Sequence, residues 1–268
     1  MKQIFFFLTI LLASAGCKKN TEKPTEIFLS EIKSKGVVTT SFEYSSDKKL
    51  IRVNGHDAGA LSYRFVFKYD VSGKVSELTS YTFPGEIPVT KSITECDNQG
   101  KILHVTTYEL QGNSPNTPVS TATFIYNTAG LLSKVERRDN DDKFLYSSNF
   151  TYYPNGNLEE MQFFRPNGLL LWLSDKSSYS VSNGSLPKGI DQVNNLMGPD
   201  YLAPFFSESS SRYTYNQGGA LLTQTSRLMS SREFNDDGSL SKELQITTFQ
   251  KPIKPKEESP LEFEYIVK

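Results

Sequence analysis

The sequence is poor in the residues from which metal centres and disulfide frameworks are built, because its 268 residues include only two cysteines and two histidines. Four such residues are too few for both a zinc site and a disulfide framework, and almost no ligands remain for zinc. A surplus of positive charge is also missing, since 29 lysines and arginines stand against 30 aspartates and glutamates. This balance excludes the basic surface that a nucleic-acid partner requires. No G-x-S-x-G, H-E-x-x-H, Walker loop or dinucleotide glycine fingerprint occurs. We therefore predict a protein that is not an enzyme and carries no cofactor or metal.

The N-terminus reads as an export signal. An apolar run from Ile4 to Ala13 follows Lys2, with the length of a signal-peptide core. Small residues lead to Cys17, and this segment looks like the lipobox of bacterial lipoproteins, in which the cysteine is lipidated. The alternative is a soluble secreted protein cut after Ala15. We predict a signal peptide at 1–16 and a lipidated Cys17 with a flexible tether over 17–36.

Attachment to the membrane is expected through the lipid alone. After residue 16 the chain contains no apolar stretch of about 18 residues, the length needed for a spanning helix. The predicted location is the cell envelope, at the outer membrane, with the periplasmic and the surface face both open.

A short motif recurs along the rest of the chain: an aromatic, three turn-type residues, glycine, any residue, then an aliphatic. The copies begin at Tyr69, Cys96, Tyr126, Tyr152, Phe164, Tyr215 and Phe234, and their glycines are Gly73, Gly100, Gly130, Gly156, Gly168, Gly219 and Gly238. A degenerate copy at Tyr44 has Lys48 in the glycine position. The motif predicts β-hairpin tips, with an Asp or Asn side chain capping the turn and glycine supplying a positive φ.

Apolar residues alternate before each tip, as in Phe65-Val-Phe67-Lys-Tyr69, which is typical of a strand with one aromatic face. After the tips they step by three, as with Leu132 and Val135. We interpret this step as a β-bulge or as burial of both faces, with helix as the weaker alternative.

Seven or eight hairpins predict about 14–16 antiparallel strands in one all-β domain over residues 37–268. Open sheets rarely exceed about ten strands, so the predicted fold is a meander curled into a barrel-like or half-open sheet. One insert, residues 185–209, lacks the motif, and the spacing of its apolar residues from Ile190 to Met197 predicts a short amphipathic helix.

The hairpin motif resembles the YD repeats of bacterial toxin shells. Together with the lipobox and the insert before Tyr213, it also resembles a Bacteroidetes lipoprotein family of unknown function with a porin-like fold. The resemblance covers about residues 37–268 and implies a curved antiparallel sheet in a Gram-negative envelope. It implies no catalytic residues.

Few residues are candidates for chemistry. His56 and His104 are far apart in the sequence, and Cys96 occupies an aromatic position of the motif, so all three are interpreted as structural. The acidic run from Asp139 to Asp142 lacks the spacing of a calcium loop and predicts a solvated turn.

Aromatic residues are the remaining binding candidates. Trp172, with Tyr81, Tyr108 and Tyr179, is a candidate stacking platform for sugar rings, although most aromatics at strand spacing belong to a core. The leading hypothesis is a non-catalytic envelope lipoprotein that binds a glycan, peptide or other small ligand on its curved sheet.

The alternative is a structural or partner-binding component of an outer-membrane assembly. A membrane-spanning porin is disfavoured, because charges such as Lys134 and Glu136 occur on both strand parities and the chain ends in Lys268.

Overall fold

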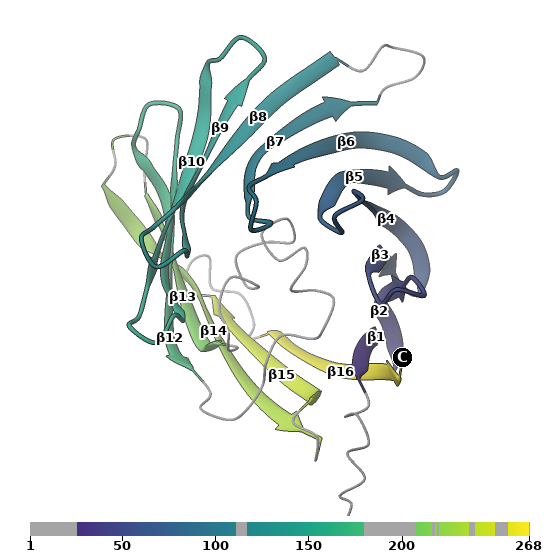
Figure 1. The fold of residues 1–268 in the computed structure, drawn as a ribbon. Coiled ribbons are helices and arrows are strands. Elements are labelled where there is room, and N and C mark those ends of the chain that lie inside the picture. Colours follow the sequence, from purple (N-terminus) through teal and green to yellow (C-terminus); the bar gives the residue numbers. More distant parts are fainter. Residues whose placement is uncertain are drawn as a thin grey trace, which may run out of the picture.

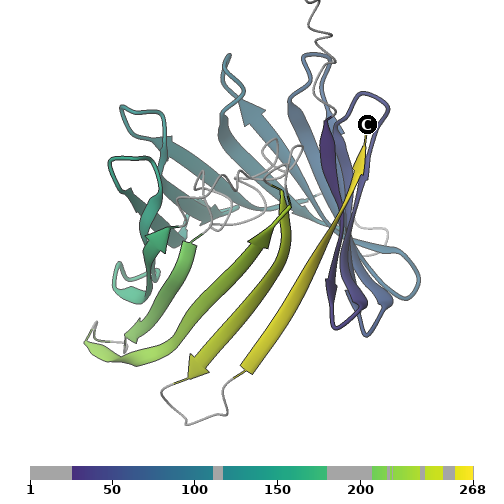
Figure 2. The same ribbon diagram turned by 90° about the horizontal axis from the view of Figure 1, so that it is seen from below.

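The computed structural model describes residues 26–110, 117–179, 207–215, 218, 220–235, 239–249 and 257–267. They form sixteen antiparallel strands that close into a barrel (Figures 1 and 2). The strands are β1 Ile27–Ser34, β2 Val37–Tyr44, β3 Leu50–Asp57, β4 Ala60–Tyr69, β5 Val75–Thr82, β6 Ile87–Cys96, β7 Ile102–Glu109, β8 Thr117–Tyr126, β9 Leu132–Asp139, β10 Phe144–Tyr152, β11 Leu158–Phe164, β12 Leu170–Tyr179, β13 Ser207–Tyr215, β14 Leu221–Phe234, β15 Leu240–Phe249 and β16 Glu257–Val267.

The topology is a meander that returns to its start. Every strand pairs with its neighbours in the chain, and β1 pairs with β16 from Ile27↔Val267 to Ser34↔Leu261. This confirms the all-β meander predicted from the repeats and decides between the two predicted forms in favour of closure. The chain enters β1 and leaves β16 at one end of the barrel, which we call the terminal end; the other is the far end.

The glycine positions of the motif adopt the backbone conformation that the sequence predicts. At the tip between β4 and β5, the Asp70 side chain accepts the backbone N–H groups of Ser72 and Lys74, each at 2.9 Å. Positive φ angles are found at Gly73 (84°), Gly100 (90°), Gly130 (78°), Gly156 (85°) and Gly168 (77°). Lys48, which replaces glycine in the degenerate copy, also has a positive φ of 63°. Gly219 and Gly238 lie outside the described residues.

A β-bulge after the tip explains the step of three. Tyr126 pairs with Leu132 and Ile125 with Lys134, so Ser133 is the extra residue. The Ser133 hydroxyl donates to the Ile125 carbonyl at 3.0 Å. The extra residue returns Leu132 and Val135 to one face, and the same shift follows the tips that begin at Tyr44, Tyr69, Cys96, Tyr152 and Phe234.

The two faces of the sheet differ sharply in burial. Phe42, Val53 and Phe65 oppose one another across β2, β3 and β4, and Phe42 and Val53 are 5% and 2% exposed. On the other face, Arg52 pairs with Glu43 at 2.8 Å, and both side chains are more than two-fifths exposed. Side chains inside a closed barrel converge, whereas those outside spread into solvent. The aromatic row is therefore the inner face and the charged row the outer face.

Tyrosines on the inner face tie neighbouring hairpins together. At the terminal end, the hydroxyl of each donates to a backbone carbonyl of the preceding hairpin: Tyr44 to Leu29, Tyr69 to Leu50, Tyr126 to Ile102, Tyr152 to Leu132 and Tyr265 to Leu240, at 2.7–2.9 Å. Cys96, in the same position, places its sulfur 3.9 Å from the Val75 carbonyl. Aliphatic side chains pack beside them in two buried clusters.

The structure changes the bounds of two segments predicted from the sequence. Strand β1, Ile27–Ser34, lies inside the segment 17–36 that the sequence assigns to a tether, so the barrel begins earlier than expected. Within the insert 185–209, residues 207–209 already belong to β13, and the expected helix falls outside the described residues. No helix occurs in the described part of the chain, and none there is long and apolar enough to cross a membrane.

Candidate functional site

A pocket of about 280 Å³ lies on β9, β10 and β11 towards the far end of the barrel. Its polar residues are directly opposed pairs, since Lys134 faces Asn149 and Glu136 faces Ser147 across β9 and β10. Phe144 at the start of β10, Phe164 at the end of β11 and Gly168 complete the lining. This size is at the small end of ligand pockets and suits a single ring or a short side chain.

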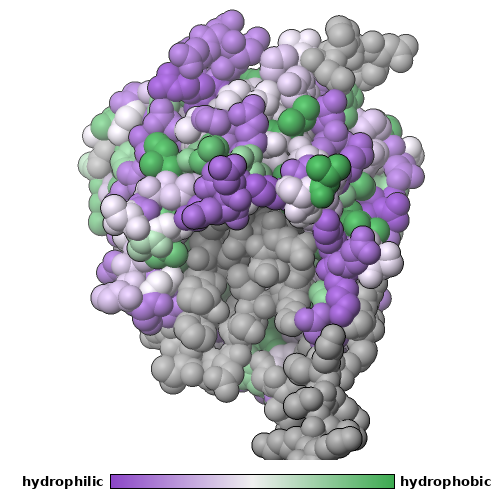
Figure 3. All heavy atoms as spheres, viewed as in Figure 1, coloured by the Kyte–Doolittle hydropathy of each residue, from purple (hydrophilic) through white to green (hydrophobic). Residues whose placement is uncertain are grey.

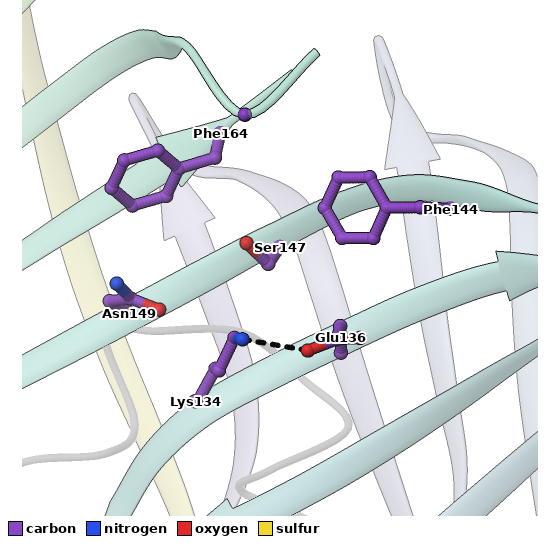
Figure 4. Close-up of a pocket in the computed structure, with 7 residues that line it drawn as sticks. Lys134, Glu136, Phe144, Ser147, Asn149 and Phe164 are labelled. Carbon is purple, nitrogen blue, oxygen red and sulfur yellow. Dashed lines mark ion pairs between the residues drawn. The ribbon is translucent and has the colours of Figure 1, made fainter. Parts of the chain in front are cut away.

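The pocket opens on the outer face of the barrel. In Figure 4, the strands that carry these side chains stand before the opposite wall of the barrel, so the side chains are seen from outside. The register agrees, because Glu136 and Thr123 are a direct pair, as are Ile125 and Lys134, and Ile125 is 43% exposed.

Register shifts next to both phenylalanines adjust their direction. Phe144 pairs with Arg138 and Tyr146 with Arg137, so Leu145 is an extra residue beside the first ring. A second shift falls between Phe163 and Phe164. Bulges re-aim the side chains beside them. In Figure 4 the Phe144 and Phe164 rings flank Ser147, and each is seen almost face on.

The charges at the pocket compensate one another. Lys134 Nζ lies 2.7 Å from one carboxylate oxygen of Glu136, and Arg138 lies 3.0 Å from the other. Hydrogen bonds from Lys134 and then Arg138 lower the pKa of Glu136. Glu136 is therefore ionised at neutral pH and holds the Lys134 ammonium along the edge of the pocket.

One amide oxygen of the pocket has unused hydrogen-bonding capacity. The Oδ1 atom of Asn149 is buried and has no hydrogen-bond partner in the described structure. A buried amide oxygen without a partner is costly, and in native proteins such an atom usually meets water or a ligand. The pocket can therefore accept a hydrogen bond from a bound molecule.

The predicted aromatic platform is divided between the two faces. Trp172 lies on the inner face, where its ring stacks on Phe163 with centroids 5.4 Å apart and an interplanar angle of 4°. The Arg212 guanidinium lies 4.4 Å from the Trp172 centroid. Because β11 and β13 flank β12, the two partners approach the indole from opposite sides, which leaves no open ring face for stacking.

Tyr81 and Tyr108 lie on the outer face, opposite Arg64 and Lys91, and Lys91 Nζ is 5.5 Å from the Tyr108 ring centroid. The Tyr179 backbone ends β12, and its side chain is outside the described residues. The structure thus does not bring Trp172 together with Tyr81 and Tyr108. Cys17 also lies outside the described residues.

The remaining polar candidates have local partners. The rings of His56 and His104 lie 3.3 Å from the hydroxyls of Ser41 and Thr123, and burial raises the pKa of the Cys96 thiol. Asp139 caps the turn between β9 and β10 through the N–H groups of Asp141 and Lys143. Among the described residues, no group of three or more His, Cys, Asp or Glu is placed to hold a metal ion.

No protein-family model matches the sequence, and no curated protein matches it. Among solved structures, a porin-like protein from Bacteroides uniformis is similar over 91% of this chain and 98% of its own, with 14% identity and a TM-score of 0.58. A porin-like protein from Bacteroides vulgatus is similar over 90% of this chain and 99% of its own, with 11% identity and a TM-score of 0.50. At this identity the similarity shows a shared porin-like barrel fold.

Proposed function

We propose that this chain is a non-catalytic, lipid-tethered protein of the bacterial cell envelope that uses its barrel as a water-exposed scaffold for ligand binding. The observation that carries the proposal is the distribution of polarity. The outer wall holds solvent-exposed ion pairs, and Figure 3 shows hydrophilic side chains over much of one face of the barrel. The inner wall of β1–β11 holds buried aromatic and aliphatic side chains, whereas the inner wall of β12–β15 also carries charge, as in the buried Arg232–Glu243 pair.

A membrane pore needs the reverse arrangement. Pores expose an apolar band to lipid and line their channel with polar groups, and a Lys or Arg on the lipid face costs about 2–4 kcal/mol at mid-membrane. Here Arg52, Lys68 and Lys134 all lie on the outer face, paired with Glu43, Glu77 and Glu136. The porin-like names of the structural neighbours therefore support an envelope location for this chain. The charged outer face argues against a conducting membrane pore.

Lipid tethering agrees with the direction of the chain. The predicted lipidation site, Cys17, precedes β1 by ten residues, and β1 starts at the terminal end. That end would face the membrane, and the far end, with the pocket near it, would face away.

Three measurements test this proposal. Purified protein added to planar lipid bilayers should give no conductance steps, and in a detergent phase separation Cys17→Ala should move the chain from the detergent to the aqueous phase. A thermal-shift screen with envelope glycans and peptides should find a stabilising ligand. Conductance steps, or a Cys17→Ala chain that stays in the detergent phase, would contradict the tethered scaffold. A screen without any stabilising compound would contradict the binding role.

A second role, as a component of an outer-membrane assembly, is favoured by exposed apolar side chains on the outer face. Ile93 on β6 and Ile125 on β8 are 38% and 43% exposed. Closure leaves no free edge among the described strands, so a partner would have to dock against this face. Affinity capture with the wild type and with Ile93→Ser should then differ in one specific envelope protein.

A further inference from the structure

We propose that the pocket between Phe144 and Phe164 binds one neutral pyranose ring of a glycan. The inference rests on the proposed binding role and adds the place and chemical class of the ligand. It moves the sugar site from Trp172, whose two ring faces are occupied, to the outer face of β9–β11.

The aromatic part of the pocket suits the apolar face of a sugar. Both phenylalanine rings are seen almost face on from outside in Figure 4, on either side of Ser147. The face of an aromatic ring carries partial negative charge and attracts the weakly positive C–H groups of a pyranose. A pocket of about 280 Å³ holds one such ring.

The polar part of the pocket suits hydroxyl groups, which donate and accept at once. Asn149 presents a buried amide oxygen that lacks a donor, and in Figure 4 this oxygen lies on the side towards Lys134. The Lys134 ammonium and the Glu136 carboxylate lie side by side, 2.7 Å apart. Neighbouring sugar hydroxyls can donate to Asn149 and Glu136 while accepting from Lys134.

The charge of the pocket argues against an anion. Its only cation, Lys134, is already paired with Glu136, so the lining carries no net charge. A phosphate or carboxylate ligand would have to approach the ionised Glu136, whose pKa is lowered by the same contacts. A neutral polyol meets no such repulsion.

The test uses the full chain in a detergent without a sugar head group. Methyl β-D-glucopyranoside, methyl β-D-galactopyranoside and methyl N-acetyl-β-D-glucosaminide are titrated by saturation-transfer NMR. N-acetylglycinamide and methyl phosphate are the other probes, because both carry C–H protons that report the transfer. We expect at least one pyranoside to bind, with the strongest transfer at ring C–H protons. Phe144→Leu and Phe164→Leu should each weaken binding about two- to tenfold, and Asn149→Ala should also weaken it. Ile93→Leu, on the outer face of β6 and three strands away from the pocket, should not.

The outcomes separate this inference from the proposed function. Pyranoside binding that is insensitive to both phenylalanine substitutions overturns the site and leaves a binding protein. If only N-acetylglycinamide or methyl phosphate binds, and this binding is lost in Phe164→Leu, the sugar is overturned as the ligand and the pocket remains a binding site. If no probe binds, the inference fails. The proposed binding role is then tested only by the thermal-shift screen with envelope glycans and peptides.

Discussion

The glycines at the hairpin tips are required by their backbone conformation. Gly156 has a φ of 85°, and nothing lies within 4 Å of the position where a Cβ would stand. Any cost of a side chain there comes from the backbone alone, because a left-handed conformation brings Cβ close to a carbonyl oxygen.

We therefore expect Gly156→Ala to lower the free energy of unfolding by about 1–2 kcal/mol. Gly156→Asn should lose less, because asparagine tolerates positive φ better than alanine does. Urea denaturation of both variants measures the difference. Equal losses would mean that packing, not φ, decides this position.

The tyrosines of the inner face stabilise the barrel through buried hydroxyl groups. Burial raises the pKa of Tyr152 to about 12, while its hydroxyl donates to the Leu132 carbonyl at 2.7 Å. The unfolded chain has an ordinary tyrosine pKa near 10. Because the folded pKa is the higher one, the stabilisation is complete below about pH 10 and is lost between that pH and about 12.

Unfolding free energies measured from pH 9 to 11 should thus fall less steeply in Tyr152→Phe than in the wild type. Tyr152→Phe should also cost about 0.5–1.5 kcal/mol at pH 7 through the lost hydrogen bond. Absorbance titration at 295 nm identifies the late-titrating group by its disappearance in the variant. An unchanged titration curve would contradict the assignment.

At the scale of elements, neighbouring strands are fitted to one another. Gly55 on β3 directly opposes Tyr63 on β4, and a Cβ on Gly55 would stand 2.0 Å from the Tyr63 ring. The Tyr63 ring lies over Gly55, so position 55 has no room for a side chain while the tyrosine keeps this conformation.

Gly55→Ala should therefore displace the ring and destabilise the protein by about 1–3 kcal/mol. In a double-mutant cycle, Tyr63→Ala should remove most of that penalty, because the space is then free. Independent, additive effects of the two substitutions would show that the ring moves aside without cost.

The alternation of tips between the two ends has a consequence for binding. In a meander, successive tips fall at opposite ends of the barrel, and the same local hairpin geometry turns its aromatic residue to opposite faces at the two ends. Tyr69, Tyr126 and Tyr152, at the terminal end, point inwards and reach backbone carbonyls. Phe164 begins a tip at the far end and lines the outer pocket.

For the whole molecule, closure is the decisive feature. The seam between β1 and β16 joins the two ends of the described chain through seven paired positions and a register shift. Lys33 and Glu264 form an ion pair across it. Without this seam, both strands would be edges with unpaired backbone groups.

Hydrogen exchange should show the seam as part of the cooperative barrel. The ladder amides of β1 and β16 should exchange with protection similar to those of β3 and β8, because opening a closed barrel exposes two edges at once. Protection of the seam strands that is lower by orders of magnitude would indicate a sheet that opens there.

Much of this architecture can be read from the sequence, because its causes are local. The aromatic–turn–glycine–aliphatic motif identifies the hairpin tips, the alternation in β4 identifies the buried face, and the step from Leu132 to Val135 reports a bulge. Strand β1 was missed because Ile27–Ser34 has no complete motif and follows a polar segment.

The pocket could not be found in this way. Lys134, Glu136, Ser147 and Phe164 come together only through the register of three strands, and Phe164 looks like any other tip aromatic until its end of the barrel is known. Turn chemistry and side-chain alternation act over a few residues, so the sequence by itself determined the hairpins and their apolar face. Only the tertiary structure decides whether the barrel closes, that Phe164 points outwards, and that Trp172 is enclosed on the inner face. These features depend on strand number, accumulated twist and pairing between distant segments.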